Sequence, residues 1–297
     1  MKLKRIIALS LSAASLALAL TACGSSSSAS DDAAQASGSS DAQTTVKLGV
    51  VGAIYEDIWA PAKEKLADEG IDLEFVQFSD YVTPNNALNS GEIDLNSFQH
   101  HIYLNTELEQ YGYAIEPVGY TFIIPLNLYS HKVSSVDEIK DGDTIAIPDD
   151  VTNGGRAIKV LASAGLITLK EDAGFNPTVD DIESYTYNVE ITPLASNTIP
   201  AALPDVTAAI VNANYAIDYG FKMDDALYVG DLNEEPYWTL IAARTEDLSD
   251  PDKVAVYDKI VKAFQSEGTK KVYEETFGGY YEPAGWDEDL LAPYKNA

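Results

Sequence analysis

Short apolar runs alternate with amphipathic helical patterns along almost the whole chain from residue 46 onward. Residues 46–51, 144–148 and 208–211 are predicted to be buried strands, and helical patterns follow the first two directly. Such strand–helix–strand alternation indicates parallel sheets with helices packed on their faces. We therefore predict an α/β fold built from mostly parallel sheets flanked by helices.

Two lobes are expected, because the folded part of the chain is long for a single core. Residues 118–129 and 237–243 are apolar stretches that we predict to cross between the lobes. Residues 98–111 have a helical pattern and are predicted to be a helix of the first lobe. The predicted boundaries are residues 46–122 with 238–297 for one lobe and residues 123–237 for the other.

The only cysteine, Cys23, closes a segment that is typical of a lipoprotein signal. A short basic start precedes an apolar stretch over residues 6–20, and Leu-Thr-Ala stands directly before the cysteine. We predict that residues 1–22 are a cleaved signal peptide and that Cys23 carries a lipid on the extracytoplasmic face of the cell membrane. The alternative is an ordinary secreted protein with a coincidental cysteine. Residues 23–45 are rich in Ser and Ala and are predicted to be a flexible tether.

Composition excludes several classes of function. A formal net charge of -28 disfavours binding to nucleic acid or to anionic lipid surfaces. With Cys23 acylated, the folded part has no thiol for a disulfide, a metal site or a nucleophile. His100 and His101 are too few for a metal site, and no nucleophile elbow or phosphate-binding glycine loop is found. We expect neither an enzyme nor a bound cofactor or metal.

The clearest sign of a ligand site lies in residues 150–156, directly after a predicted strand. Open parallel sheets bind their ligands at this end of the strands. Thr152, Asn153 and two glycines precede a helix predicted over residues 155–164, so free backbone N–H groups could receive an anion there. This segment is therefore a candidate site for a negatively charged ligand group.

Arg156 strengthens that interpretation, because only two arginines, Arg156 and Arg244, follow the signal segment. A cation in the first turn of a helix is unfavourable unless it meets a negative partner. A ligand carboxylate held bidentately by the guanidinium would provide that partner. The alternative is a structural ion pair with a nearby acid such as Asp149.

Three further positions follow predicted strands and could complete a site. Asn212 can accept a hydrogen bond from an ammonium group, although it could also form an ordinary Asx turn. Tyr81, Phe98 and His100 could wall an apolar slot, or their rings could simply pack the surface between the lobes. The residues thus suggest a clamp for a zwitterion beside an aromatic slot.

These segments together resemble the family of methionine-binding lipoproteins of ABC importers, the substrate-binding proteins of the NlpA/MetQ type. The resemblance covers nearly all of residues 46–297, and the order and spacing of its motifs are specific. The motifs are Phe78-Ser79-Asp80-Tyr81-Val82, Phe98-Gln99-His100, Thr152-Asn153-Gly154-Gly155-Arg156-Ala157 and Asn212-Ala213-Asn214-Tyr215-Ala216.

The resemblance implies a two-lobed periplasmic-binding-protein fold of type II that closes on an amino acid. It implies a monomer that delivers L-methionine or a relative to a membrane permease driven by an ATPase. Carried over to this sequence, Arg156 and Asn153 would hold the ligand carboxylate, and Asn212 would hold the α-ammonium group with help from Tyr81. The slot for the thioether side chain would be lined by Phe98, His100 and Tyr81.

Several positions depart from the family's usual pattern, at Val151, Ile102 and residues 192–197, and at Asn127 and Trp238. Asn127 and Trp238 lie on the predicted crossing segments beside the cleft. A bulky Trp238 is therefore expected to shorten or reshape the pocket and to alter which side chain is recognised.

Two alternatives to a methionine receptor remain at this point. The first is a receptor for another amino acid or a methionyl dipeptide, which would use the same clamp. The second is a surface lipoprotein that acts as an adhesin or sensor through protein contacts, with a degenerate pocket. Binding of a free amino acid would separate the first possibility from the second.

Overall fold

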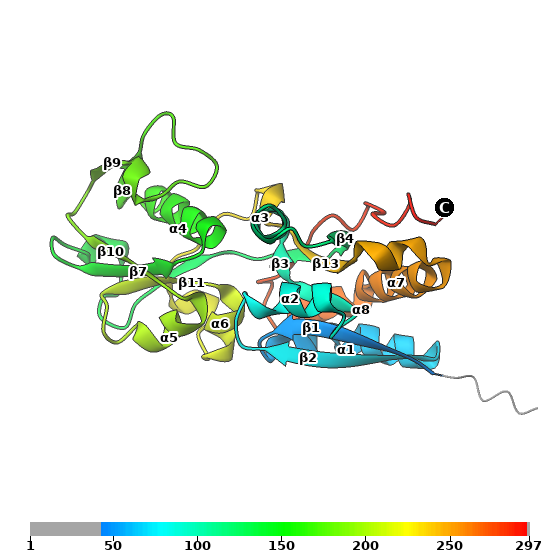
Figure 1. Ribbon diagram of the computed structural model, residues 1–297. Coiled ribbons are helices and arrows are strands. Elements are labelled where there is room, and N and C mark those ends of the chain that lie inside the picture. Colours follow the sequence, from blue (N-terminus) through cyan, green and yellow to red (C-terminus); the bar gives the residue numbers. More distant parts are fainter. Residues whose placement is uncertain (1–42, 296–297) are drawn as a thin grey trace, which may run out of the picture. The chain divides into compact units, whose positions relative to one another are not determined.

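The computed structural model describes residues 43–295, and it contains two five-stranded sheets that form the cores of two lobes (Figure 1). The predicted signal peptide, Cys23 and nearly all of the predicted tether lie outside the described residues. The last two residues assigned to the tether, Thr44 and Thr45, are instead the start of a strand. None of the helices within residues 43–295 is long and apolar enough to cross a membrane.

The first sheet has the strand order β2-β1-β3-β13-β4, and we call the part of the chain around it the first lobe. β2, β1 and β3 run parallel, whereas β13 is antiparallel to both of its neighbours, β3 and β4. The strands are β1 (Thr44–Val51), β2 (Ile71–Phe78), β3 (Leu95–His100), β4 (Ile115–Tyr120) and β13 (Thr239–Arg244).

The second sheet has the order β10-β7-β11-β6-β12, and the part of the chain around it is the second lobe. β10, β7 and β11 run parallel, and β6 is antiparallel to both β11 and β12. The strands are β6 (Asn127–Tyr129), β7 (Thr144–Pro148), β10 (Glu190–Leu194), β11 (Ala208–Val211) and β12 (Ala226–Tyr228).

The chain passes between the sheets twice, from β4 to β6 and from β12 to β13. Each arriving strand inserts between two strands of the sheet that it joins and runs antiparallel to both. Each sheet is therefore mixed, with a parallel half and an antiparallel half. The predicted α/β fold, with two sheets flanked by helices, is confirmed, but the sheets are half parallel rather than mostly parallel, because each takes in a strand that arrives from the other lobe.

Helices cover both faces of the first sheet. Successive side chains of a strand point to opposite faces, and β13 shows this clearly. Ile241 and Ala243 belong to the apolar cluster of α1, α7 and α8, whereas Leu240 and Ala242 belong to that of α2 and α3. The helices are α1 (Ile54–Asp68), α2 (Thr83–Ser90), α3 (His101–Tyr111), α7 (Pro251–Phe264) and α8 (Glu267–Glu275).

The second sheet is covered by α4 on one face and by α5 and α6 on the other. The cluster around α5 and α6 also takes in Val51, Phe98 and Tyr103 of the first lobe, so buried apolar contacts join the two lobes. The helices are α4 (Val151–Ser163), α5 (Ile199–Ala202) and α6 (Ala213–Asp218). The remaining short strands are β5 (Phe122–Ile123), β8 (Ile167–Leu169), β9 (Ile182–Tyr185) and β14 (Glu282–Pro283).

The predicted helix over residues 98–111 is wrong in its first turn, because β3 continues to His100 and α3 begins at His101. Every residue of β3 is buried although four of the six are polar, so the strand does not show the alternation of apolar and polar residues that marks a half-buried strand. The buried amides of Asn96 and Gln99 instead donate to Asn85 Oδ1, at 2.9 and 2.7 Å. The sequence analysis also did not predict α6 or β12.

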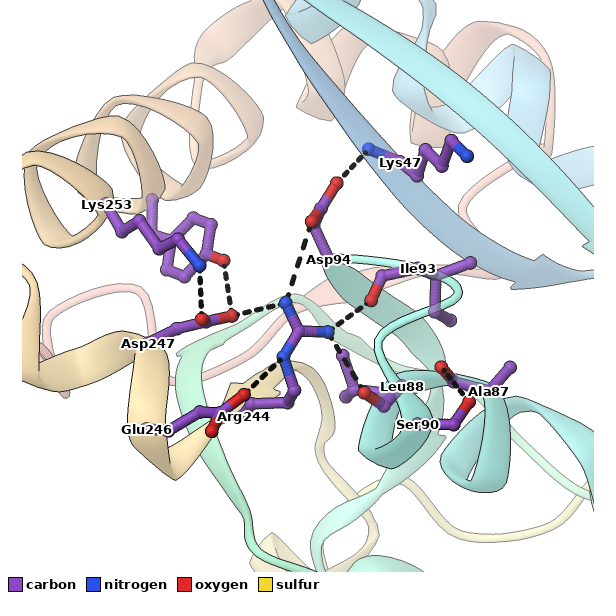
Figure 2. A network of polar contacts seen from close by, with 11 residues as sticks. Lys47, Ala87, Leu88, Ser90, Ile93, Asp94, Arg244, Glu246, Asp247 and Lys253 are labelled. Atoms are coloured by element: carbon purple, nitrogen blue, oxygen red, sulfur yellow. Dashed lines mark hydrogen bonds and ion pairs between the residues drawn. The ribbon is translucent and has the colours of Figure 1, made fainter.

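Arg244, at the end of β13, ties three parts of the first lobe together (Figure 2). Its guanidinium lies 2.6 Å from Asp247 Oδ2, and it donates to the carbonyl oxygens of Leu88 in α2 and of Ile93 in the segment after α2. Asp247 also accepts from Lys253 and from the Tyr257 hydroxyl, both on α7. The buried ion pair thus links the sheet to helices on either side.

Asp247→Asn is expected to lower the free energy of unfolding by about 3–5 kcal/mol, because it leaves a buried arginine without its closest carboxylate. The matched control is Glu246→Gln, since that side chain is 81% exposed and lies 3.7 Å from the same guanidinium. The control should cost less than about 1 kcal/mol. Urea unfolding of both variants measures the difference, and equal losses would contradict a structural role for the buried pair.

Candidate functional site

Five of the six residues proposed to contact a ligand line one cavity between the lobes, with about 470 Å³ of space not filled by protein atoms. The first lobe contributes side chains from β3 and from the loop after β2, and the second lobe contributes side chains from α4 and from the end of β11. The five residues are Tyr81, Phe98, His100, Asn153 and Asn212. Their contact with a ligand stays a prediction.

A chain of hydrogen bonds forms the polar wall of this cavity. Asn212 Nδ2 donates to Asn153 Oδ1 at 2.9 Å, and Asn153 Nδ2 donates to both carboxylate oxygens of Asp150 at 3.0 and 3.1 Å. Asn212 Oδ1 is buried and has no hydrogen-bond partner among residues 43–295. An unpaired buried acceptor is costly, so this oxygen is well suited to receive a donor from a ligand.

His100 lies at the end of β3 and caps α3. Its Nδ1 accepts the backbone N–H of Tyr103 at 3.1 Å, so in the neutral ring Nε2 carries the proton and faces Asn153 Oδ1 at 3.4 Å. Burial, together with the smaller effect of the nearby positive charge of Arg156, lowers the pKa of His100 to about 3. The imidazole is therefore neutral near pH 7.

Arg156 is buried behind the cavity rather than in its wall. Its Nη2 donates to the carbonyl oxygen of Ile124 at 2.7 Å, and its guanidinium lies 4.5 Å from the centre of the Tyr237 ring. Burial lowers the pKa of Arg156 to about 10, which leaves it charged at neutral pH. Within residues 43–295 it makes no ion pair, so the alternative of a structural pair with Asp149 is not what the structure contains.

The start of α4 differs from the prediction. α4 begins at Val151, four residues early, so Arg156 lies in the second turn rather than in the first. Asp150 caps the helix, and its carboxylate accepts the backbone N–H of Asn153 at 2.8 Å and the hydroxyl of Thr152 at 3.0 Å. A carboxylate of the protein thus already occupies the helix end that we expected to receive the ligand's carboxylate.

Aromatic rings form the opposite wall. The ring of Tyr81 lies 5.9 Å from that of Phe98 and 5.0 Å from that of Tyr215. The Tyr81 hydroxyl donates to Asn214 Oδ1 at 2.5 Å, and Tyr103 packs edge-on against Phe98. Such rings suit an apolar or polarizable side chain.

Sequence reasoning missed several lining residues, among them Tyr55 and Thr239. Tyr55 lies in the first turn of α1, just after β1, so the rule that ligands bind beyond strand ends could have found it. Trp238, expected to reshape the pocket, does not line the cavity and packs edge-on against Tyr120 at 5.5 Å. Asn127 also lies away from the cavity wall, where its amide bonds Tyr129 and Gly230. The expectation that both residues lie at the cavity is therefore wrong, whereas their effect on which side chain is recognised stays a prediction.

Among residues 43–295, no group of three or more His, Cys, Asp or Glu side chains could hold a metal ion. The chain matches the NlpA lipoprotein family over residues 46–285. It is 38% identical over 238 residues to the D-methionine-binding lipoprotein MetQ of Escherichia coli, an alignment that covers 79% of this chain and 86% of that protein. The chain belongs to the NlpA lipoprotein family. The resemblance inferred from the motifs is confirmed.

Solved structures of similar proteins support this membership. A nutrient-binding protein from Burkholderia cenocepacia bound to methionine is 36% identical, with a TM-score of 0.73, and the match covers 80% of this chain and 99% of that one. The substrate-binding protein of a methionine transporter from Streptococcus pneumoniae is 32% identical, with a TM-score of 0.76, and the match covers 81% and 95%. This member of the NlpA lipoprotein family thus shares its two-lobed fold with substrate-binding proteins.

The buried neutral histidine predicts a pH-dependent stability. The ordinary pKa of 6.5 applies to His100 in the unfolded chain, whereas burial lowers it to about 3 in the folded protein. Between these pH values only the unfolded chain binds the proton, so the free energy of unfolding falls as the pH falls from about 6.5 and is unaffected above that range. The slope from this group is at most about 1.4 kcal/mol per pH unit.

Urea unfolding between pH 4 and pH 8 checks this expectation with His100→Gln and with the exposed His131→Gln as control. His100→Gln should lose less stability on acidification than the wild type, and His131→Gln should follow the wild-type curve. Parallel curves for all three proteins would show that His100 does not carry the dependence.

Proposed function

We propose that this protein is the substrate-binding protein of an ABC importer and binds L-methionine or a close relative in the cavity between its lobes. The relatives and solved structures to which the chain is most similar support this assignment. The protein binds and releases its ligand without chemical change and hands it to a membrane permease driven by an ATPase.

The observation that carries the proposal is a pair of unmet charge and hydrogen-bond requirements at the cavity. Arg156 is a buried cation without an anionic partner among residues 43–295, and Asn212 Oδ1 is a buried acceptor without a donor. An α-amino acid supplies both missing groups, a carboxylate for the guanidinium and an ammonium for the amide oxygen.

Asn153 and Arg156 are three residues apart on α4, so they share a face of the helix. Asn153 lines the cavity, and the Ile124 carbonyl that Arg156 contacts belongs to another lining residue. The carboxylate therefore replaces or joins the Ile124 carbonyl as the partner of the guanidinium. The thioether lies against the rings of Tyr81 and Phe98, where sulfur makes favourable aromatic contacts.

The two lobes move as units during binding, and their boundaries are residues 46–122 with 238–297, and residues 123–237. In support, all strands of the second sheet lie within the second range, and the first sheet lies within the first apart from Thr44 and Thr45. The protein acts as a monomer, since one chain supplies both walls of the cavity.

Arg156→Met is expected to weaken L-methionine binding by about 30-fold or more, because losing one partner of a desolvated charged pair costs about 2 kcal/mol or more. Asn212→Ala should also weaken binding, whereas Asn188→Ala, an exposed asparagine of the same lobe, should not. Calorimetric titration of refolded protein with L-methionine, D-methionine, other amino acids and methionyl dipeptides measures these affinities. Binding of none of them to the wild type would refute an amino-acid receptor.

The protein is held on the extracytoplasmic face of the cell membrane by a lipid on Cys23, which completes a lipoprotein signal. Cys23→Ala should move the protein from the membrane fraction to the soluble fraction of fractionated cells. Cells that express Ser25→Ala serve as control and should keep the protein in the membrane. An unchanged distribution for Cys23→Ala would contradict lipid anchoring at this residue.

A further inference from the structure

Helix α1 of the first lobe begins without a capping side chain of its own. Ala53 occupies the capping position and offers no acceptor for the free N–H groups of the first turn. The acceptor comes instead from the second lobe, because Asp218 Oδ2 lies 3.1 Å from the backbone nitrogen of Ala53. A carboxylate at the end of α6 thus caps a helix of the opposite lobe.

Gly52 makes this approach possible. Its backbone has φ +99°, a conformation that side chains disfavour, and a Cβ atom at this position would lie 2.5 Å from Asp218 Oδ2. Only glycine therefore leaves room for the carboxylate. Burial raises the pKa of Asp218, and the hydrogen bonds that the carboxylate accepts from the N–H groups of Ala53 and Ile54 oppose that rise.

Further hydrogen bonds join α6 to the first lobe beside this contact, along a line of contacts that we call the seam. Asn214 Nδ2 donates to the carbonyl oxygen of Val51 at 3.1 Å, and Asn214 Oδ1 accepts from the Tyr81 hydroxyl. Tyr215 reaches the carbonyl oxygen of Ser79 at 3.4 Å. Every one of these bonds joins α6, which follows β11, to the last residue of β1 or to the segment directly after β2.

The same short helix also starts at the cavity. Asn212, directly before α6, lines the cavity and holds the unpaired oxygen, whereas Asp218 at the other end does not line the cavity. One rigid turn and a half of helix therefore connects the ligand's expected ammonium site with the contact to α1. A ligand that fixes Asn212 also favours the position of Asp218.

We propose that Asp218 is a closing latch: its carboxylate caps α1 only when the lobes are together, and it sets ligand affinity without touching the ligand. The effect of Asp218 on ligand affinity rests on the proposed function, whereas its capping of α1 on closure does not. Since ligand binds the closed form, a smaller closed population weakens apparent binding in proportion. Asp218 is thus a positioning residue for closure, and Gly52 is the partner that its approach requires.

The first measurement is the distance between the lobes in ligand-free protein. Two exposed positions, Glu64 on α1 and Glu183 on β9, take spin labels through Glu64→Cys and Glu183→Cys in the mature chain with Cys23→Ser. Pulsed electron spectroscopy then gives the distance distribution. Asp218→Asn keeps the size of the side chain and removes its charge, and it should shift the distribution toward a longer or broader separation.

Two further variants keep the test decisive. Gly52→Ala blocks the approach from the other side of the contact and should produce the same shift. Asp224→Asn removes an exposed acid of the same lobe six residues further on, and it should match the wild type. A merely structural role for Asp218 would lower the stability to urea but leave the distance distribution unchanged.

The second measurement is L-methionine affinity and its rates by stopped-flow fluorescence. Asp218→Asn should weaken binding by about 2- to 5-fold, the range expected when a negative charge is lost at a helix N-terminus, and mainly by faster dissociation. If the wild type binds no amino acid but the distances shift, the proposed function fails and the latch stands. Unchanged distances in both Asp218→Asn and Gly52→Ala overturn the latch.

Discussion

Each lobe depends on a strand that the chain delivers from the other lobe. β13 lies inside the first sheet between β3 and β4, and β6 lies inside the second sheet between β11 and β12. Neither strand is an edge strand, so each sheet would be split without it. All six residues of β13 are buried, with successive side chains in the clusters on opposite faces. The two crossings therefore bind the lobes into one molecule while placing a cavity between them.

The two buried arginines differ in how many partners balance their charge, and this difference separates a structural residue from a candidate binding residue. Arg244 is buried beside three carboxylates and two backbone carbonyls, and these partners offset the cost of removing its charge from water. Arg156 is equally buried but has one backbone carbonyl and the face of Tyr237. A desolvated cation with so few partners marks a place where an anion is expected from outside. The contrast between these two arginines is a stronger guide to the site than the shape of the cavity.

Helix α6 contributes residues both to the cavity and to the seam beside it. α6 carries Asn212 at its start and Asp218 at its end, so the proposed binding residue and the proposed closing contact share one helix. Polar groups on the seam bond backbone atoms rather than other charges, which makes the contacts directional and short in range. Such contacts distinguish a closed arrangement from an open one more sharply than apolar packing does.

Much of the fold could be predicted from the sequence where local patterns are strong. The runs that became β1, β7 and β11 are apolar and short, and the helices after β1 and β7 have clear amphipathic patterns. β3 could not be predicted to its end, because its buried amides are satisfied by Asn85 from α2, a residue distant in the sequence. The start of α4 was misplaced since Asp150, Thr152 and Asn153 are all plausible caps, and only the folded chain selects Asp150.

The sequence by itself determined the compartment signal, the α/β class and the kinds of side chain that gather after the strands, because these follow from local composition and periodicity. Only the tertiary structure decided how the candidate residues divide their roles. It turned Trp238 and Asn127 away from the cavity, set Arg156 behind its wall, and brought Asp218 to the start of α1. Those outcomes depend on contacts between residues far apart in the chain, and no local pattern records them.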